Sequence, residues 1–259
     1  MRNQLVYSVQ GKGPPLVLLH PVGIDCTFWG PLVERASGLH TVISVDLMGH
    51  GASPPAPPER GITAYAADVA ALLDELGFAD AALLGLSFGG MIAQEFAVDR
   101  PKRLSALIVG ACGPRIPAEA REAVRARGKV DPAKGMASVV DQTMQRWFTP
   151  AFMNAEPAQR VRARLLADDT AGWAAGWNAI SGFDAFDRLG SIAVPTLVVA
   201  GERDAGTPVA ATKAIADAIP GAEFALLPGA PHMMQIECAD RFADRVMAFL
   251  RDVAGRAKA

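Results

Sequence analysis

Short apolar runs alternate with longer segments of helical periodicity along most of the chain. The runs are rich in Val, Leu and Ile and have the length of buried strands, whereas the segments between them place apolar residues on one helical face. The predicted strands are Gln4 to Val9, Leu16 to His20, Thr41 to Asp46, Ala81 to Leu86, Leu104 to Gly110, Thr196 to Gly201 and Glu223 to Leu227. This alternation predicts an α/β fold with a mostly parallel, doubly wound sheet covered by helices.

Two segments show the helical pattern clearly. Apolar residues repeat at spacings of three and four in both of them, so each predicts a helix with one face on the sheet. The repeating residues are Tyr65, Val69, Leu72, Leu73 and Leu76 in the first segment, and Phe242, Val246, Phe249 and Leu250 in the second. The second segment predicts a helix that closes the fold near the end of the chain.

The alternation of strands and helices breaks after Gly110. Residues 114–190 have a helical and basic-rich pattern, are punctuated by prolines and contain three of the four tryptophans. A strand pattern resumes at Thr196, directly after this segment. We therefore predict a core made of residues 1–113 and 191–259, with residues 114–190 inserted as a helical cap.

Composition excludes several classes of protein. The chain has 259 residues, 51% of them hydrophobic and 20% charged, as in a globular protein with one large core. Its net charge of -2 provides no positive field for nucleic acid. No apolar run approaches the roughly 20 residues that cross a bilayer, and the N-terminus lacks the apolar region of a secretory signal. We expect a cytoplasmic protein without a membrane partner.

The cysteines support a reducing compartment. Cys26, Cys112 and Cys238 are odd in number and form no CxxC pair, which predicts free thiols. With no His pair at i, i+4 and no Cys/His cluster, we expect no metal, and no motif indicates another cofactor. The sequence leaves the oligomeric state open.

A sharp turn between a strand and a helix carries the first candidate for chemistry. Gly85-Leu86-Ser87-Phe88-Gly89 has the form G-x-S-x-G and separates a predicted strand from a helical segment that begins at Met91. In such a turn the serine Oγ lies above the sheet, and glycines are needed because side chains would collide with neighbouring elements. The pattern predicts Ser87 as a nucleophile.

The chain order of a catalytic triad indicates the partners of this serine. A serine hydroxyl needs a base, usually histidine, and after such a turn the order is serine, acid, histidine. Of the four histidines, His232 alone follows the last predicted strand. Asp204 follows the strand that ends at Gly201 and is the predicted acid, with Glu202 as its local competitor.

Two backbone N–H groups are expected to form an oxyanion hole. Phe88, the residue after the nucleophile, supplies one of them. The loop His20-Pro21-Val22-Gly23 supplies the other, and Val22 is favoured because Pro21 has no N–H to donate. We expect His20 to brace this loop without taking part in proton transfer.

These motifs together resemble the α/β-hydrolase superfamily over nearly the whole chain. The resemblance rests on the His20 loop, Asp46-x-x-Gly49-x-Gly51-x-Ser53, the Ser87 turn, Gly201-x-x-Asp204 and His232. It implies the α/β-hydrolase fold with an inserted helical cap, and it implies that Asp46 belongs to a structural turn. The reaction that it implies is hydrolysis of a small-molecule carboxylic ester or lactone through an acyl-enzyme.

A narrower resemblance is to the 3-oxoadipate enol-lactonases of aromatic catabolism. It rests on residues 85–94, 146–150 and 167–173, whereas the His-Pro-Val-Gly loop departs from the Ser-Leu-Gly pattern more common in that family. The resemblance implies an anionic substrate. The cap suits one, because 11 Lys and Arg stand against 9 Asp and Glu in residues 114–190.

Five cap residues are candidates for the substrate pocket. They are Arg146, as partner for a substrate carboxylate, together with Trp147, Phe148, Trp173 and Trp177. Packing within the cap is the competing interpretation of the aromatic residues. Two alternatives to ester hydrolysis also remain: cleavage of a carbon–carbon bond or peroxide formation on the same triad, and a ligand-sensing protein that hardly turns over.

Overall fold

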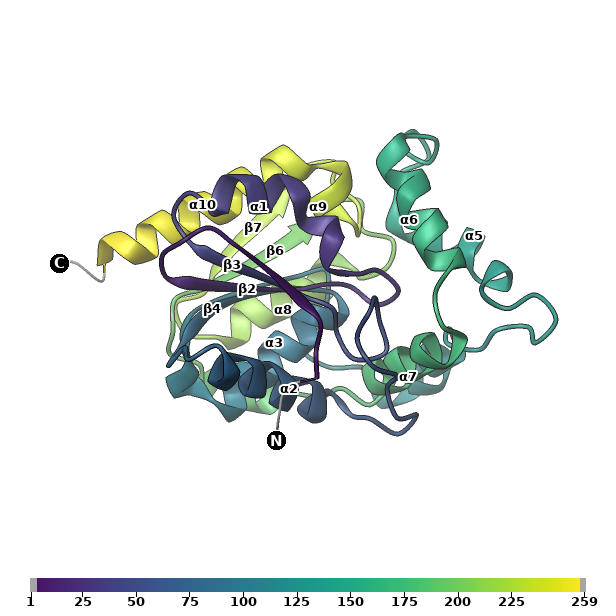
Figure 1. Ribbon diagram of the computed structural model, residues 1–259, viewed down its shortest axis with the longest axis horizontal. Helices are drawn as coiled ribbons and strands as arrows, with labels where there is room; N and C mark the ends of the chain where they lie inside the picture. The colour runs from purple at the N-terminus through teal and green to yellow at the C-terminus, as the bar shows by residue number, and fades with distance from the viewer. Residues whose placement is uncertain (1–3, 257–259) are drawn as a thin grey trace.

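The sheet of the computed structural model, which describes residues 4–256, has helices on both faces (Figure 1). Its strands are β1 (Tyr7–Gln10), β2 (Pro15–Leu19), β3 (Thr41–Val45), β4 (Ala81–Leu86), β5 (Leu104–Gly110), β6 (Thr196–Gly201) and β7 (Glu223–Leu227). They lie in the order β1-β3-β2-β4-β5-β6-β7. β1 is antiparallel to β3, and the other neighbouring pairs are parallel, which confirms the predicted mostly parallel sheet.

The first strand differs from its prediction. It begins at Tyr7 and not at Gln4, whereas the strands β4 to β7 have the predicted bounds. Tyr7 pairs with Val45, the last residue of β3, and the Val6 carbonyl accepts a hydrogen bond from the Asp46 N–H at 2.9 Å. The Val6 N–H donates to Ser53 Oγ at 2.8 Å. The apolar alternation therefore extends beyond the first residue of β1.

The helices enclose the sheet and extend beyond one end of it. They are α1 (Gly30–Ala36), α2 (Ile62–Glu75), α3 (Phe88–Asp99), α4 (Arg121–Ala126), α5 (Val140–Trp147), α6 (Glu156–Leu166), α7 (Thr170–Ser181), α8 (Val209–Ala218), α9 (Met234–Glu237) and α10 (Ala239–Arg256). Short 3-10 turns are η1 (Cys26–Trp29), η2 (Pro101–Arg103), η3 (Ala118–Ala120), η4 (Met136–Ser138) and η5 (Phe186–Ser191). Between residues 4 and 256, none of the helices combines the length and apolar character that a bilayer crossing requires.

Two hydrophobic cores lie on opposite faces of the sheet. α2 and α3 cover one face and α1 and α10 the other (Figure 1). All six residues of β4 are buried, because both faces of a central parallel strand pack against helices. The predicted helical faces are confirmed, since Tyr65 and Val69 of α2 and Phe242 and Val246 of α10 are buried.

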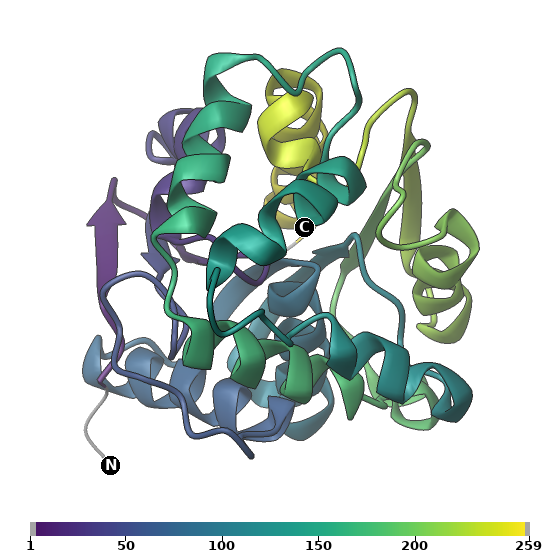
Figure 2. The same ribbon diagram turned by 90° about the vertical axis from the view of Figure 1, so that its right-hand side faces the viewer.

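The segment between β5 and β6 supplies α4 to α7. These helices lie beyond the carboxyl ends of the strands, in front of the sheet in Figure 2. We call residues 114–190 the cap, and its bounds as a separate unit stay a prediction.

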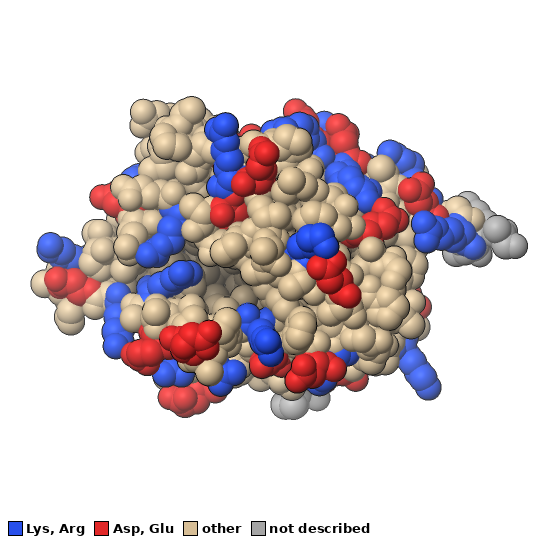
Figure 3. Space-filling view, turned by 180° about the vertical axis from the view of Figure 1, so that it is seen from behind, with Lys and Arg blue, Asp and Glu red and all other residues tan. Residues whose placement is uncertain are grey.

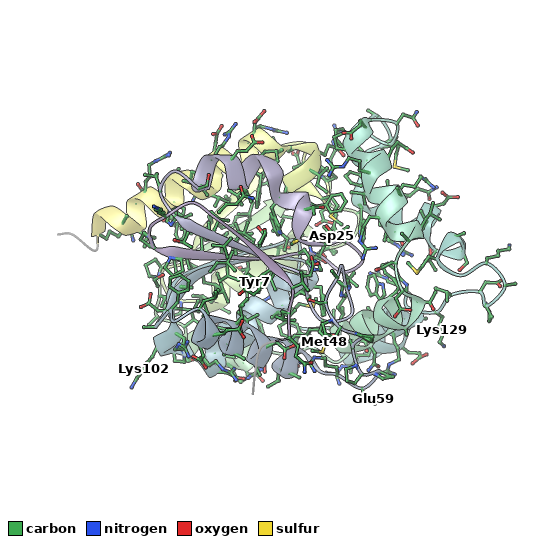
Figure 4. All side chains as sticks on the ribbon, in the orientation of Figure 1. Tyr7, Asp25, Met48, Glu59, Lys102 and Lys129 are labelled. Carbon is green, nitrogen blue, oxygen red and sulfur yellow. The ribbon has the colours of Figure 1, made fainter. Side chains whose placement is uncertain are left out.

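Polar contacts fasten the cap to the core. Arg164 Nε of α6 lies 2.8 Å from Asp25 Oδ2, and Asp25 lies at the end of the sheet that faces the cap (Figure 4). The Thr149 N–H donates to Glu237 Oε2 at 3.0 Å, and the Met233 N–H donates to the Trp147 carbonyl at 3.0 Å. The end of α5 is thus attached to the core beside α9.

Replacing Gly172 of α7 by alanine is expected to lower the free energy of unfolding by about 1–3 kcal/mol. A Cβ atom there would lie 2.1 Å from the Gly49 carbonyl oxygen, so α7 would have to move away from the core. Urea unfolding measures the loss. Gly30→Ala is the matched control, because this helical glycine has no atom within 4 Å of its Cβ position. Equal stability of the two variants would contradict the close contact.

Candidate active site

Ser87 joins β4 to α3 in a strained conformation. Its φ of 53° and ψ of -116° place a residue other than glycine in a region that costs about 1–3 kcal/mol. A Cβ atom at Gly85 would lie 2.1 Å from the Gly89 carbonyl oxygen, and one at Gly89 would lie 2.0 Å from the Leu19 carbonyl oxygen. The glycines of the motif are therefore required by the close approach of α3 to the ends of β4 and β2.

His232 and Asp204 form a buried pair. His232 Nδ1 lies 2.9 Å from each carboxylate oxygen of Asp204, and the side chains are 5% and 2% exposed. Asp204 Oδ1 also accepts hydrogen bonds from the N–H groups of Gly206 and Thr207, both at 2.7 Å. These donors hold the carboxylate in place, and the carboxylate orients the imidazole so that Nε2 is the ring nitrogen left for other contacts.

The imidazole of His232 is closely packed. A Cβ atom at Gly206 would lie 2.8 Å from His232 Nδ1, so this position needs glycine. The Trp147 ring lies nearly parallel to the imidazole, with an interplanar angle of 17° and a centroid distance of 6.4 Å. Glu202, the competing acid, is exposed and accepts a hydrogen bond from the Gly229 N–H at 2.7 Å. In this arrangement the acid beside the histidine is Asp204.

Ser87 and His232 line one cavity of about 350 Å³. Arg146, Trp147 and Trp177 from the predicted pocket also line it.

Two of the predicted pocket residues are absent from the lining of this cavity. Phe148 is buried against Phe152, with ring centroids 5.7 Å apart. Trp173 is 1% exposed, and its Nε1–H donates to the Arg127 carbonyl at 3.1 Å. In the described structure both aromatic rings pack inside the protein, and Trp173 positions the backbone of Arg127.

The cavity has a basic lining that the sequence indicated only in part. Arg115 and Arg127 line it together with Arg146, and no Asp or Glu is among the described lining residues. Figure 3 shows a hollow on the cap side of the molecule with Lys and Arg side chains on its border. Arg127 was missed because it lies just after the short helix α4, where no periodicity assigns its direction.

The two predicted oxyanion donors lie on adjoining segments. Phe88 begins α3, and the loop that contains Val22 follows β2. This loop packs against the first turn of α3, since a Cβ atom at Gly89 would lie 2.9 Å from the His20 carbonyl oxygen. Among the described hydrogen bonds, neither the Val22 N–H nor the Phe88 N–H donates to a protein acceptor. Both remain available to a bound oxyanion.

Comparison with known proteins identifies the family. The sequence pattern of the alpha/beta hydrolase family matches residues 16–245. The chain belongs to this family. It is 30% identical to 3-oxoadipate enol-lactonase 2 of Acinetobacter baylyi over 245 residues, which are 93% of this chain and 90% of that protein.

Two solved structures are also similar to this hydrolase. The enol-lactonase from Burkholderia xenovorans LB400 is 30% identical with a TM-score of 0.89, over 95% of this chain and 96% of that chain. A thermophilic esterase from Thermogutta terrifontis, solved with malate bound, is 30% identical with a TM-score of 0.90, over 96% of this chain and 93% of that chain. The α/β-hydrolase fold is confirmed.

Two buried histidines lie at the loop that follows β2 in the hydrolase. His20 Nε2 accepts a hydrogen bond from the Leu47 N–H at 3.0 Å, so the ring proton is on Nδ1, which donates to the Pro21 carbonyl at 2.7 Å. The His50 ring lies 5.2 Å from the His20 ring. Burial lowers the pKa of His20 to about 4 and that of His50 to about 3, so both are neutral near pH 7.

The free energy of unfolding is expected to fall as the solution is acidified below pH 6.5. The pKa values of His20 and His50 are lower in the folded protein than the ordinary value of 6.5. Their stabilising contribution is therefore complete above pH 6.5 and is lost as the pH falls through the folded values. His50→Leu should reduce the loss between pH 6.5 and about 4.5 by about 2 kcal/mol.

Urea unfolding at a series of pH values measures this difference. Burial raises the pKa of Asp168 to about 6, which acts in the opposite direction, but this residue is common to both proteins and cancels in the comparison. Equal pH slopes for the wild type and His50→Leu would contradict a buried neutral His50.

Proposed function

We propose that this hydrolase cleaves carboxylic esters or lactones through an acyl-enzyme formed on Ser87. One arrangement supports this proposal. His232 is paired through Nδ1 with the buried carboxylate of Asp204, and it lines the same cavity as the strained Ser87. A serine hydroxyl is a weak nucleophile without such a base.

Each residue has a separate part in this reaction. Ser87 Oγ attacks the carbonyl carbon while His232 Nε2 takes the hydroxyl proton, and Asp204 stabilises the resulting imidazolium. His232 then returns the proton to the leaving alcohol or enol as the bond to the carbonyl carbon breaks. A water molecule, deprotonated by His232, attacks the acyl-enzyme and releases the acid with regeneration of Ser87.

The N–H groups of Val22 and Phe88 stabilise the negative charge that develops on the carbonyl oxygen. Phe88 is the first residue of α3, so the positive end of the helix dipole also lies next to this oxygen. Both contributions increase as the carbonyl becomes tetrahedral, and they therefore favour the transition state over the bound substrate.

Within this reaction class, the substrate we propose is 3-oxoadipate enol-lactone. The enol-lactonases of Acinetobacter baylyi and Burkholderia xenovorans are similar over nearly the whole chain. The lining of the cavity contains Arg115, Arg127 and Arg146 and no described Asp or Glu, which suits a substrate that carries a carboxylate. The malate bound to the related esterase of Thermogutta terrifontis agrees with an anionic ligand.

Ser87→Ala is expected to lower kcat for an ester substrate by several orders of magnitude, with the thermal unfolding temperature little changed, because the hydroxyl borders a cavity. Asp204→Asn should lower kcat by roughly 10⁴-fold, since the amide favours the wrong imidazole tautomer. Steady-state kinetics measure both effects.

The matched control for the acid is Glu202→Gln, which makes the same chemical change at an exposed carboxylate on the same loop. It should retain kcat within about threefold, a change of less than 1 kcal/mol in the barrier. A larger loss at Glu202 than at Asp204 would reverse the assignment of the acid. Ser87→Ala with activity within about tenfold of the wild type would exclude the acyl-enzyme mechanism.

The proposal of 3-oxoadipate enol-lactone as the substrate predicts that the enzyme prefers an anionic substrate to a neutral one. Wild-type kcat/KM for 3-oxoadipate enol-lactone should exceed that for its methyl ester by about 10- to 100-fold, the range of one charge-assisted hydrogen bond. Hydrolysis of the two compounds under identical conditions measures the ratio. A ratio near one would eliminate the enol-lactone and retain the ester hydrolase. Faster turnover of a vinylogous diketone or of peroxide would favour the alternative chemistries.

A further inference from the structure

The arginines of the cap differ in their partners. Exposed Arg115 lies over the Phe186 ring and Arg121 donates to the Ile116 carbonyl, and the other arginines form two groups. Five of them are ion-paired with carboxylates: Arg125 with Glu122, Arg160 with Glu156, Arg162 with Asp141, Arg164 with Asp25 and Asp168, and Arg188 with Glu95 and Asp99. In contrast, the guanidinium groups of Arg127 and Arg146 form no ion pair or hydrogen bond with any residue that the structure describes, and both line the cavity that contains Ser87. Both side chains are half-buried.

Arg127 and Arg146 also affect each other electrostatically. Burial lowers the pKa of Arg127, and the positive charge of Arg146 lowers it further. Two like charges in one partly buried space repel each other and lose part of their hydration. Because no described carboxylate lines this cavity, an anionic ligand would supply a compensating charge that the described lining does not.

Other cap residues hold Arg127 in place. Its carbonyl accepts the hydrogen bond from Trp173 Nε1–H at 3.1 Å. Its guanidinium carbon lies 5.3 Å from the centroid of the Trp177 ring, where a cation–π contact stabilises it. A Cβ atom at Gly128 would lie 2.9 Å from Trp177 Cβ, so the chain after α4 is packed tightly on α7. The backbone and the guanidinium of Arg127 are therefore both held by packing and hydrogen bonding within the cap.

We propose that Arg127 and Arg146 together bind a substrate carboxylate that is remote from the carbonyl attacked by Ser87. The inference rests on the proposed function for the reacting end of the substrate. Guanidinium groups suit this task because each can donate two parallel hydrogen bonds to a carboxylate. When the carboxylate belongs to the acyl part of the ester, hydrolysis adds a second carboxylate, so the product is a dicarboxylate that the same arginines bind.

A pair of chromogenic esters tests this subsite. Mono-4-nitrophenyl adipate carries a remote carboxylate, and 4-nitrophenyl hexanoate has an acyl chain of the same length without it. The ratio of their kcat/KM values should fall about 10- to 100-fold in Arg127→Gln and in Arg146→Gln. Arg127→Lys keeps the charge but not the planar fork, so its ratio should fall less than that of Arg127→Gln.

Arg125→Gln is the matched control for cap charge. Arg125 lies two residues before Arg127, is exposed and is paired with Glu122 at 3.2 Å, so its removal should leave the ratio within about twofold of the wild type. If Arg127→Gln or Arg146→Gln changes both esters equally and leaves the ratio unchanged, the subsite is wrong. An equal fall of the ratio in Arg125→Gln would also overturn it, because the net charge of the cap would then be responsible.

Calorimetric titration of Ser87→Ala with adipate separates the subsite from the reaction. Adipate should bind, and adding Arg127→Gln to Ser87→Ala should weaken its binding by about 10-fold or more. If wild-type protein hydrolyses neither ester but adipate still binds through Arg127, the proposed function fails and the subsite stands. If the esters are hydrolysed without discrimination and adipate does not bind, the subsite fails and the ester hydrolase stands.

Discussion

The architecture of the site depends on one close approach of backbones, where β4 passes into α3 through Ser87. Side chains at Gly85 and Gly89 would overlap the carbonyl groups of the facing backbone, so α3 can start directly against the ends of β4 and β2. The strain at Ser87 is sustained by packing on both sides, because β4 is buried along its whole length. The same contact brings the loop after β2 to the amino end of α3, so the Val22 and Phe88 segments adjoin.

Parallel pairing supplies the other part of the site. Ser87, Asp204 and His232 follow β4, β6 and β7, and the carboxyl ends of parallel strands meet at one edge of the sheet. β6 and β7 are paired up to Gly201 and Leu227, so the loops after them lie side by side. The 2.9 Å contact of His232 with Asp204 follows from this register.

The cap contributes arginine and tryptophan side chains to the wall of the cavity that Ser87 and His232 line. Its end near Trp147 is held by backbone and side-chain contacts to the core, which places one aromatic ring beside His232. Five of its arginines are ion-paired with carboxylates, whereas the structure describes no ion pair for Arg115, Arg127 and Arg146 at the cavity. The cavity wall is therefore more basic than the small net charge of the cap implies.

The sequence by itself determined the strands β4 to β7, the sharp turn at Ser87 between β4 and α3, and the positions of Asp204 and His232 after β6 and β7, because these depend on local periodicity and on the order of strand ends. It did not determine where β1 begins, since the register of β1 with β3 begins at Tyr7 opposite Val45 whatever the pattern of the preceding residues. Nor did it determine which cap residues face the cavity. Trp173 and Trp177 lie one turn apart on α7, yet Trp177 lines the cavity and Trp173 does not. Helical periodicity identifies which residues share one face of a helix. Only the packing of α4, α5 and α7 on the core determines whether that face lies against the cavity.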